Sequence, residues 1–186
     1  MEQETKKTIL IVLWCVAAAV LVAGAVWLWM YFAPFSSYHS KQYRFSMIYP
    51  NQWKMMDGNP QAGLAIVFVR PKETALDVLQ PNVNITLQDV PDKFATIESF
   101  STLITKQMTN YFKTTIKVIQ DKDYTFARRK GHCLVIAVPK PEDYRMIFVW
   151  TIKGSYAYIF TFMCKGNQYE KLLPTVKRMI NSFEFK

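Results

Sequence analysis

Hydrophobic and polar residues follow two different patterns along this chain. Residues 9–33 form one run without a charged or strongly polar side chain. A bilayer core of about 30 Å is crossed by about 20 apolar residues of helix, so the run predicts a single membrane-spanning helix. From residue 43 onward, apolar positions recur at intervals of two or of three to four. This second pattern predicts strands and amphipathic helices of a domain that folds in water.

Aromatic residues mark both ends of the predicted membrane helix. Trp27, Trp29 and Tyr31 lie near its C-terminal end, and Trp14 lies near the other end. Such rings favour the headgroup level of a bilayer. We therefore expect these four residues to position the anchor, and Pro34 to stop the helix because it lacks a backbone N–H.

Small residues occur inside the run. Ala19 and Ala23 are spaced by four residues, with Gly24 beside them, and this arrangement permits close packing against another helix. Contact with lipid is the alternative. Two other interpretations of the run stay open, namely a cleaved signal peptide and a lipid attached to Cys15.

Positive charge predicts the orientation of the anchor. Lys6 and Lys7 immediately precede the run, whereas the first cation after it is Lys41. Cytoplasmic flanks carry the excess of Lys and Arg. We therefore expect a short cytoplasmic tail at 1–8 and a single pass through the inner (plasma) membrane. A linker at 34–42 then leads to an extracytoplasmic, periplasmic domain at 43–186.

The second pattern predicts the order of elements in the domain. Alternation favours strands, and Thr96 is placed to cap a helix whose apolar stripe includes Phe100 and Ile104. The terminal helix is expected to open at Asn167, with Glu170 completing a capping box. Pro174 falls within this helix and is expected to break one backbone hydrogen bond or to restart the helix there. The expected elements are strands at 43–49, 53–56, 64–70 and 82–89, a helix at 97–112, strands at 115–120, 123–129, 131–138, 145–152 and 155–163, and the terminal helix.

Short turns between consecutive strands require antiparallel pairing, and the two amphipathic helices can then cover the sheet. The expected fold class is therefore α+β, with an N-terminal membrane helix followed by an antiparallel sheet flanked by helices. Register predicts that the two cysteines of the domain stay free thiols. Cys133 is expected opposite Val149, Val149 opposite Tyr158, and Cys164 too far along for the 7 Å that a disulfide allows.

Charge adds a candidate contact surface. The net charge of +9 falls on residues 34–186, which suits anionic lipid headgroups or an acidic partner surface. Arg128, Arg129 and Lys130 form a dense basic cluster in an expected turn, and we predict that this cluster contacts such a surface; an ordinary solvated turn is the alternative. Nucleic acid is not expected as a partner, because the domain is predicted to be exported.

The sequence offers little catalytic chemistry. His39 lies in the linker, and His132 is adjacent to Cys133 on a strand, where neighbours point to opposite faces. The close acidic pairs, Asp121 with Asp123 and Glu142 with Asp143, fall in expected turns. We therefore expect no catalytic residue, no metal site and no cofactor.

Three segments resemble the PsbP/Mog1-like (DcrB-like) domain family across residues 43–186. They are YRFSMIYPNQW at 43–53, NVNITLQDVPDKFATIESF at 82–100 and MINSFEF at 179–185. The resemblance implies a PsbP/Mog1-like α/β sandwich and non-covalent binding to a larger partner without catalysis. The chain departs from the family's lipoproteins by its predicted spanning helix.

These observations predict a membrane-anchored, non-catalytic accessory subunit that binds or stabilises a larger membrane protein complex. The alternative is a ligand-binding envelope protein with a pocket between the sheet and the helix at 97–112. An enzyme is the third hypothesis, and it would require His132 to meet a carboxylate in a cleft with a shifted pKa.

Overall fold

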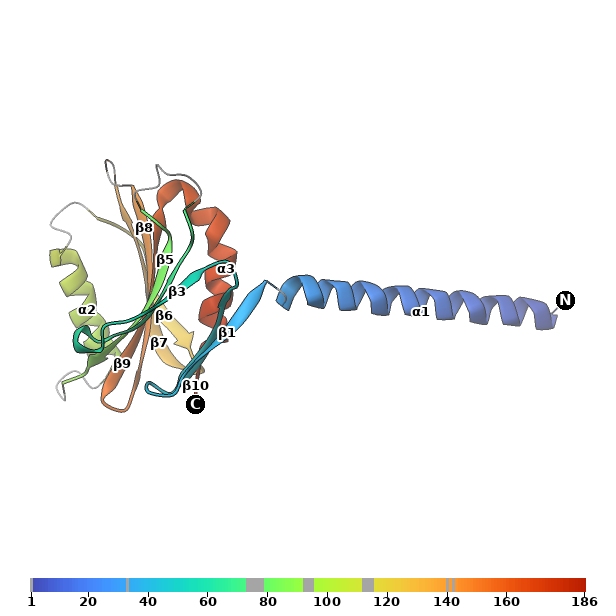
Figure 1. Cartoon of the computed structure of the whole chain (residues 1–186), viewed down its shortest axis with the longest axis horizontal. Helices are drawn as coiled ribbons and strands as arrows, with labels where there is room; N and C mark the ends of the chain where they lie inside the picture. Colours follow the sequence, from blue (N-terminus) through green and yellow to red (C-terminus); the bar gives the residue numbers. More distant parts are fainter. Residues whose placement is uncertain are drawn as a thin grey trace. The chain divides into compact units, whose positions relative to one another are not determined.

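A computed structural model of the chain describes residues 2–32, 34–72, 79–91, 96–111, 116–139, 141 and 143–186 (Figure 1). For residues 2–12, 30–32 and 111 it describes the backbone alone. Clustering of contacts divides the chain into two compact units, Met1–Ser36 and Ser37–Lys186.

The first unit consists mainly of helix α1 (Glu2–Phe32). The helix expected at 9–33 is thus present, although it begins earlier and ends two residues before Pro34, which cannot continue a helix. Every described side chain of α1, from Leu13 to Trp29, is exposed. No helix in the described part of the chain is both long enough and apolar enough to cross a membrane. The membrane-spanning role of residues 9–33 therefore stays a prediction.

The second unit contains two antiparallel sheets. A seven-stranded sheet has the order β3-β4-β5-β9-β8-β7-β6, and a three-stranded sheet has the order β1-β2-β10. The strands are β1 (Phe35–Ser40), β2 (Phe45–Pro50), β3 (Lys54–Asp57), β4 (Leu64–Val69), β5 (Asn82–Asp89), β6 (Lys117–Phe126), β7 (Arg129–Val138), β8 (Tyr144–Lys153), β9 (Tyr156–Lys165) and β10 (Glu184–Phe185).

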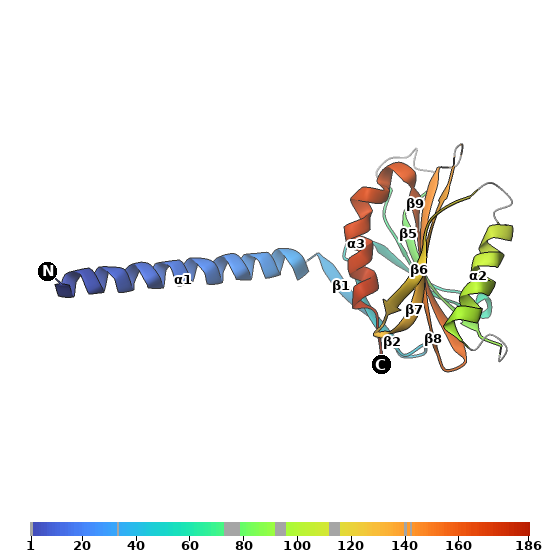
Figure 2. The ribbon, with the colours of Figure 1, turned by 180° about the vertical axis from the view of Figure 1, so that it is seen from behind.

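Two helices cover the large sheet from opposite sides. Figures 1 and 2 show α2 (Ile97–Tyr111) on one face and α3 (Tyr169–Ser182) on the other. Because strand residues alternate between faces, the long central strands contribute apolar side chains to both layers. The α+β fold expected from the sequence is confirmed.

Each helix closes a separate part of the core. The layer under α2 contains Phe100, Ile104, Leu134, Ile136, Met146, Phe148, Trp150, Ala157 and Ile159. On the other face, α3 buries Leu172, Val176, Met179 and Ile180. Aromatic rings extend this second layer towards the small sheet, where Phe183 stacks on Phe45 with ring centroids 4.8 Å apart.

One expectation about strands was wrong in a way that matters for function. Residues 117–126 form the single strand β6, not two strands separated by a turn at Asp121. Asp121 and Asp123 were expected in turns, but both lie within this strand. As the last strand of the sheet, β6 keeps most of its side chains exposed, so its carboxylates remain hydrated and cause no break.

The terminal helix also differs from expectation. A 3-10 turn occupies Gly166–Gln168, and α3 begins only at Tyr169, with Gln168 at its N-cap and no side-chain cap. The prediction of a capping box formed by Asn167 and Glu170 is therefore wrong. Pro174 lies inside the helix as expected, and α3 continues through it without restarting. The apolar side of α3 packs on the sheet, and this packing outweighs one lost backbone hydrogen bond.

The pairing of β8 with β9 corrects the predicted cysteine register. Cys133 is opposite Val149 as expected, but Val149 pairs with Phe160 instead of Tyr158. Gly154 and Ser155 form the turn between β8 and β9, one residue later than expected. The partner of each β8 residue on β9 is therefore two residues later than predicted. Cys133 and Cys164 are nevertheless both buried free thiols, which confirms the prediction.

Candidate functional site

A groove of about 600 Å³ lies between α2 and the strands β6 and β7. The alternative hypothesis placed a ligand pocket between the sheet and the helix at 97–112, and this groove borders that helix. We call it the α2 groove. Its lining residues are Glu98, Ser101, Thr102, Thr105, Lys106, Thr109 and Asn110 from α2, Asp121 and Asp123 from β6, and His132 from β7.

Periodicity explains why these polar residues converge. On α2 the lining positions lie beside the buried stripe that includes Phe100 and Ile104, so one side of the helix packs and its flank stays polar. On β7, His132 shares a face with the core residue Leu134, because alternate residues of a strand point the same way. Asp123 pairs directly with His132 in the ladder between β6 and β7.

His132 is held between two carboxylates and an indole ring. Its Nε2 atom contacts Asp121 Oδ1, and its Nδ1 atom lies 3.7 Å from Asp123 Oδ1. The imidazole stacks on Trp150 with ring centroids 5.0 Å apart and planes inclined by 30°. The side chain of His132 is 14% exposed. These contacts fix both the position and the orientation of the ring.

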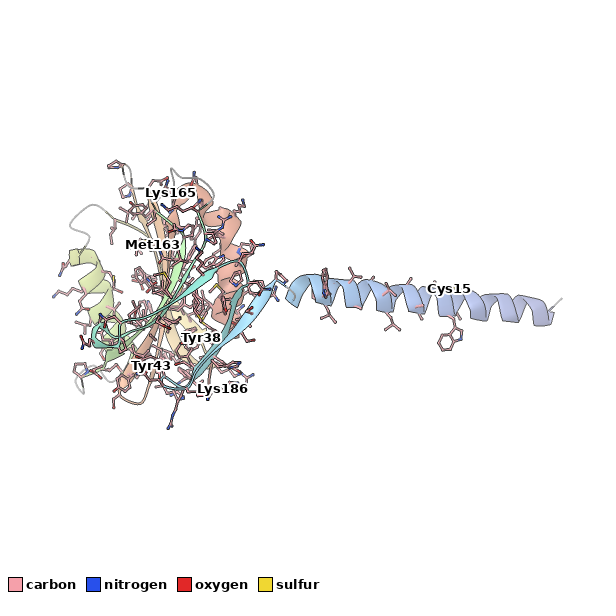
Figure 3. The ribbon with its side chains drawn as sticks, in the orientation of Figure 1. Cys15, Tyr38, Tyr43, Met163, Lys165 and Lys186 are labelled. Atoms are coloured by element: carbon pink, nitrogen blue, oxygen red, sulfur yellow. The ribbon has the colours of Figure 1, made fainter. Side chains whose placement is uncertain are left out.

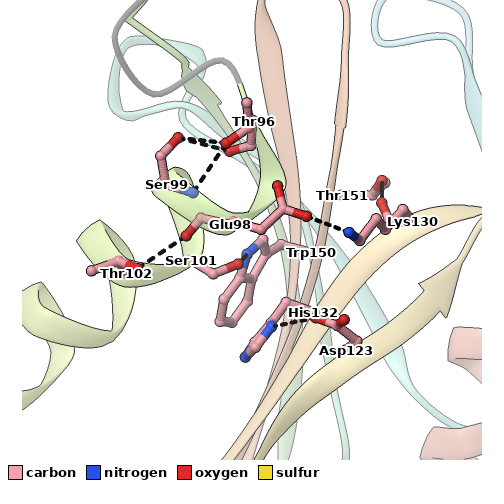
Figure 4. Close-up of polar contacts among 10 residues, drawn as sticks. All are labelled: Thr96, Glu98, Ser99, Ser101, Thr102, Asp123, Lys130, His132, Trp150 and Thr151. Carbon is pink, nitrogen blue, oxygen red and sulfur yellow. Dashed lines mark hydrogen bonds and ion pairs between the residues drawn. The ribbon is translucent and has the colours of Figure 1, made fainter.

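One buried hydrogen bond links α2 to strand β8 of the sheet. Trp150 is fully buried, and its Nε1–H donates to Ser101 Oγ over 3.0 Å (Figure 4). Ser101 is 7% exposed. A buried indole N–H without a partner would lose a hydrogen bond that it makes with water in the unfolded chain. The bond therefore fixes Ser101, which lines the groove, against β8.

Hydroxyl groups along α2 have defined hydrogen-bonding roles. Thr102 Oγ1 donates to the carbonyl oxygen of Glu98 over 3.0 Å, and Thr109 Oγ1 donates to that of Thr105 over 2.8 Å. With their protons committed, these two hydroxyls can only accept from a ligand. The Thr96 cap expected from the sequence is confirmed, because the Ser99 N–H donates to Thr96 Oγ1 over 3.2 Å (Figure 4).

Glu98, one of the lining residues, forms an ion pair with Lys130 of β7. Lys130 Nζ contacts Glu98 Oε1 (Figure 4). This hydrogen bond lowers the pKa of Glu98 and raises the pKa of Lys130. The backbone carbonyl of Lys130 accepts from the hydroxyl of the buried Thr151 over 2.7 Å, which ties this strand end to β8.

The structure separates the three residues of the predicted basic cluster. Arg128 lies in the turn between β6 and β7, whereas Arg129 and Lys130 are strand residues. Arg129 Nε donates to the carbonyl oxygen of Ile152 over 3.1 Å, and Lys130 pairs with Glu98. Because neighbouring strand residues face opposite ways, Arg129 and Lys130 point to different sides of the sheet. The contact predicted for the cluster stays a prediction.

The predicted anchor residues lie on α1. Trp14, Trp27 and Trp29 are 72%, 64% and 71% exposed, while the side chain of Tyr31 lies outside the described residues. A Cβ built at Gly24 would meet no described atom within 4 Å, and Ala19 and Ala23 are exposed on the same helix. Cys15 is also exposed there (Figure 3).

His132 meets carboxylates in a groove, which is part of what the enzyme hypothesis required. Both ring nitrogens of His132 face carboxylates, and its neighbour Cys133 lies on the opposite face, where Gln120 Nε2 donates to its sulfur. The ring is therefore not aligned on a hydroxyl or thiol nucleophile. Among the described residues, no group of three or more His, Cys, Asp or Glu side chains is arranged to hold a metal ion.

Part of this site could not be predicted locally. The sequence indicated a pocket and singled out His132, but it missed both the Ser101–Trp150 bond and the carboxylates around the imidazole. Assigning 117–126 as one strand would have placed Asp121 and Asp123 on one face, which was the available signal.

Comparisons with known proteins agree with this architecture. The PsbP family model matches residues 33–185. The solution structure of the cyanobacterial PsbP, CyanoP, from Synechocystis sp. PCC 6803 is similar with a TM-score of 0.63 and 13% identity, covering 83% of this chain and 94% of that chain. A search of curated proteins gave no match.

Two further structures share the fold. The Ran-binding protein Mog1p of Saccharomyces cerevisiae has a TM-score of 0.55 and 10% identity, covering 81% of this chain and 95% of that one. LpqN of Mycobacterium tuberculosis is described as involved in cell envelope biogenesis. It has a TM-score of 0.54 and 8% identity, covering 82% of this chain and 90% of that one. At such identities the likeness concerns the fold alone.

Proposed function

Because the chain belongs to the PsbP family, we propose that it is a membrane-anchored, non-catalytic accessory protein. Residues 9–33 hold it in the inner membrane as a single-pass anchor. The domain lies at the outer face, where it binds or stabilises a larger membrane protein complex. The family fits a non-catalytic accessory role.

The exposed apolar surface of α1 is the observation that carries this proposal. Val20, Leu21 and Trp29 are 66%, 73% and 71% exposed. An apolar surface of this extent needs a cover, either lipid or another helix. Lys6 and Lys7 precede the uncharged run and favour a cytoplasmic N-terminus.

Anchoring would also allow the domain to bind a membrane complex through weak contacts. A tether raises the effective concentration of the domain near any complex in the same membrane. Ala19, Ala23 and Gly24 are proposed to pack against a helix of that complex. Arg128, the residue of the basic cluster at the tip of its turn, is proposed to contact an acidic surface.

Purification of the full chain in a mild detergent tests the proposal. We expect a larger membrane protein complex to co-purify, and Arg128→Glu to reduce its yield because the variant reverses the charge at the contact. Lys54→Glu is the matched control, because Lys54 is exposed on β3, far from this turn in the strand order. If the protein runs alone at its own mass, the accessory role is wrong.

The α2 groove supports a second candidate function, that of a ligand-binding envelope protein. Its volume of about 600 Å³ falls within the range of about 300–1,000 Å³ typical of small-ligand sites. Several polar groups converge on it from α2, β6 and β7.

A further inference from the structure

We infer that the α2 groove binds a neutral, polyhydroxylated ligand, namely one or two units of a saccharide. This inference rests on the second proposed function and names its ligand class. It follows from the hydrogen-bonding capacity left open in the groove, the presence of both signs of charge in its lining and the fixed ring of His132.

An unused donor lies in the lining of the groove. The hydroxyl of Ser101 accepts from Trp150, and its own O–H has no acceptor among the described residues. Ser101 is 7% exposed and lines the groove. A buried hydroxyl of this kind is favourably paired by a ligand oxygen, because leaving the donor without a partner costs free energy.

The rest of the lining presents donors and acceptors together. Lys106 and Asn110 offer N–H groups, and the structure gives their side chains no hydrogen bond within the described part of the chain. Asp123 is 76% exposed and accepts only. A suitable ligand must therefore both donate and accept. Sugar hydroxyl groups do both, because each carries one proton and two lone pairs.

Charge argues against an ionic ligand. A cation that approaches Asp121 and Asp123 also meets Lys106, and an anion that approaches Lys106 meets both carboxylates. Glu98 is already paired with Lys130. Each ionic ligand would thus face a like charge in the same groove, whereas a neutral ligand would face none.

His132 supplies a rigidly held ring. Its ring stacks on Trp150 and is held by Asp121 and Asp123, so no rotamer freedom is lost when a ligand binds. Preorganised groups of this kind reduce the entropy cost of binding. The exposed part of the ring, 14% of the side chain, lines the groove and offers a fixed edge for contact with a sugar C–H group.

Calorimetric titration of the full chain tests the inference. The protein is kept in a detergent without a sugar headgroup, since such a headgroup would itself compete. The probes are neutral oligosaccharides of glucose, galactose, mannose and N-acetylglucosamine, each up to about 10 mM, with hexalysine and inorganic phosphate as ionic probes. We expect at least one oligosaccharide to bind, and more tightly than either ionic probe.

Two variants locate the binding in the groove. Asp123→Asn removes a carboxylate acceptor, and Thr105→Val removes a hydroxyl at nearly constant shape; each is expected to weaken binding roughly tenfold. Asp57→Asn on β3 and Thr125→Val, which lies on β6 outside the groove, are the matched controls and should bind normally. Circular dichroism checks that every variant is folded.

Three results would overturn the inference: no oligosaccharide binds, an ionic probe binds more tightly, or the groove variants bind like the controls. Any of these removes the saccharide site without affecting co-purification of a membrane complex. Conversely, a protein that runs alone but binds an oligosaccharide loses the accessory role and keeps the site.

Discussion

Burial controls the chemistry of the two cysteines in the domain. Cys164 is fully buried, and desolvation raises its pKa to about 12 against the opposing effect of Arg145. Burial also raises the pKa of Cys133, while the hydrogen bond from Gln120 acts in the other direction. Both residues therefore behave as small apolar side chains with protonated thiols.

The raised pKa of Cys164 predicts a loss of stability in alkali. The unfolded thiol releases its proton near pH 9, whereas the folded thiol keeps it until about pH 12. Unfolding thus releases a proton in this interval, so the free energy of unfolding should fall as pH rises, by up to about 1.4 kcal/mol per pH unit. Below about pH 9 the contribution is fully present.

Denaturant unfolding between about pH 8 and about pH 11 measures this slope. Cys164→Ala removes the titrating group and should give a shallower decline than the wild-type chain, whatever its absolute stability. Equal slopes in the two proteins would contradict the assignment, because other alkaline groups are common to both.

At the same scale, His132 shows why the candidate site was only partly predictable. The sequence predicted that His132 lies on a strand and that Cys133 points to the opposite face of the sheet. The stacking of His132 on Trp150 depends on register across β7 and β8, and the bond from Trp150 to Ser101 joins residues 49 apart. No local pattern encodes contacts of that range.

At the scale of elements, the turn between β6 and β7 is conformationally strained. Phe126 pairs with Arg129, which leaves Ala127 and Arg128 as a two-residue turn with φ angles of 51° and 59°. Two-residue hairpin turns with both φ angles positive favour Asn-Gly. Residues other than glycine, asparagine and aspartate pay a steric cost in that region.

Ala127→Asn combined with Arg128→Gly should therefore raise the free energy of unfolding by about 1 kcal/mol. Chemical denaturation of the full chain measures the change. Arg129→Gly is the matched control, and it should destabilise the protein because it removes the hydrogen bond from Arg129 Nε to the Ile152 carbonyl oxygen and because glycine loses more backbone entropy on folding. A lower stability of the Asn-Gly variant would show that the native turn is not strained.

Element types were predictable where periodicity was strong, as in α2 and β5. The errors occurred where a residue type suggested a break that packing overrode. Asp121 was interpreted as a turn residue but lies within the edge strand β6. Helix α3 likewise passes through Pro174 without the restart that the sequence allowed. Residues 34–42 were expected to be a linker, yet they include β1, which joins the small sheet.

At the scale of the whole molecule, the central prediction concerns where the chain resides. Val16 and Val20 are 57% and 66% exposed on α1, and arginine at the centre of a membrane helix costs about 2.5–3.5 kcal/mol per residue on insertion scales. Val16→Arg combined with Val20→Arg should therefore move the full chain out of alkali-washed membranes.

The wild-type chain and the Val16→Leu, Val20→Leu variant should stay in the membrane fraction, because leucine preserves the apolar surface. Immunoblotting of washed membranes and supernatant measures the distribution. Recovery of the wild-type chain in the supernatant would refute the anchor, and with it the accessory role proposed for the domain.

The irregular edge strand β6 affects how copies of this domain can associate at high density. It forms one margin of the large sheet, and its register with β7 shifts between Val118 and Gln120, so its outer hydrogen-bonding groups lack a regular repeat. Lys122 lies between Asp121 and Asp123, which adds charges of both signs to this margin. Neighbouring copies at high density thus meet an interrupted, charged border, and the domain should resist polymerising through that border.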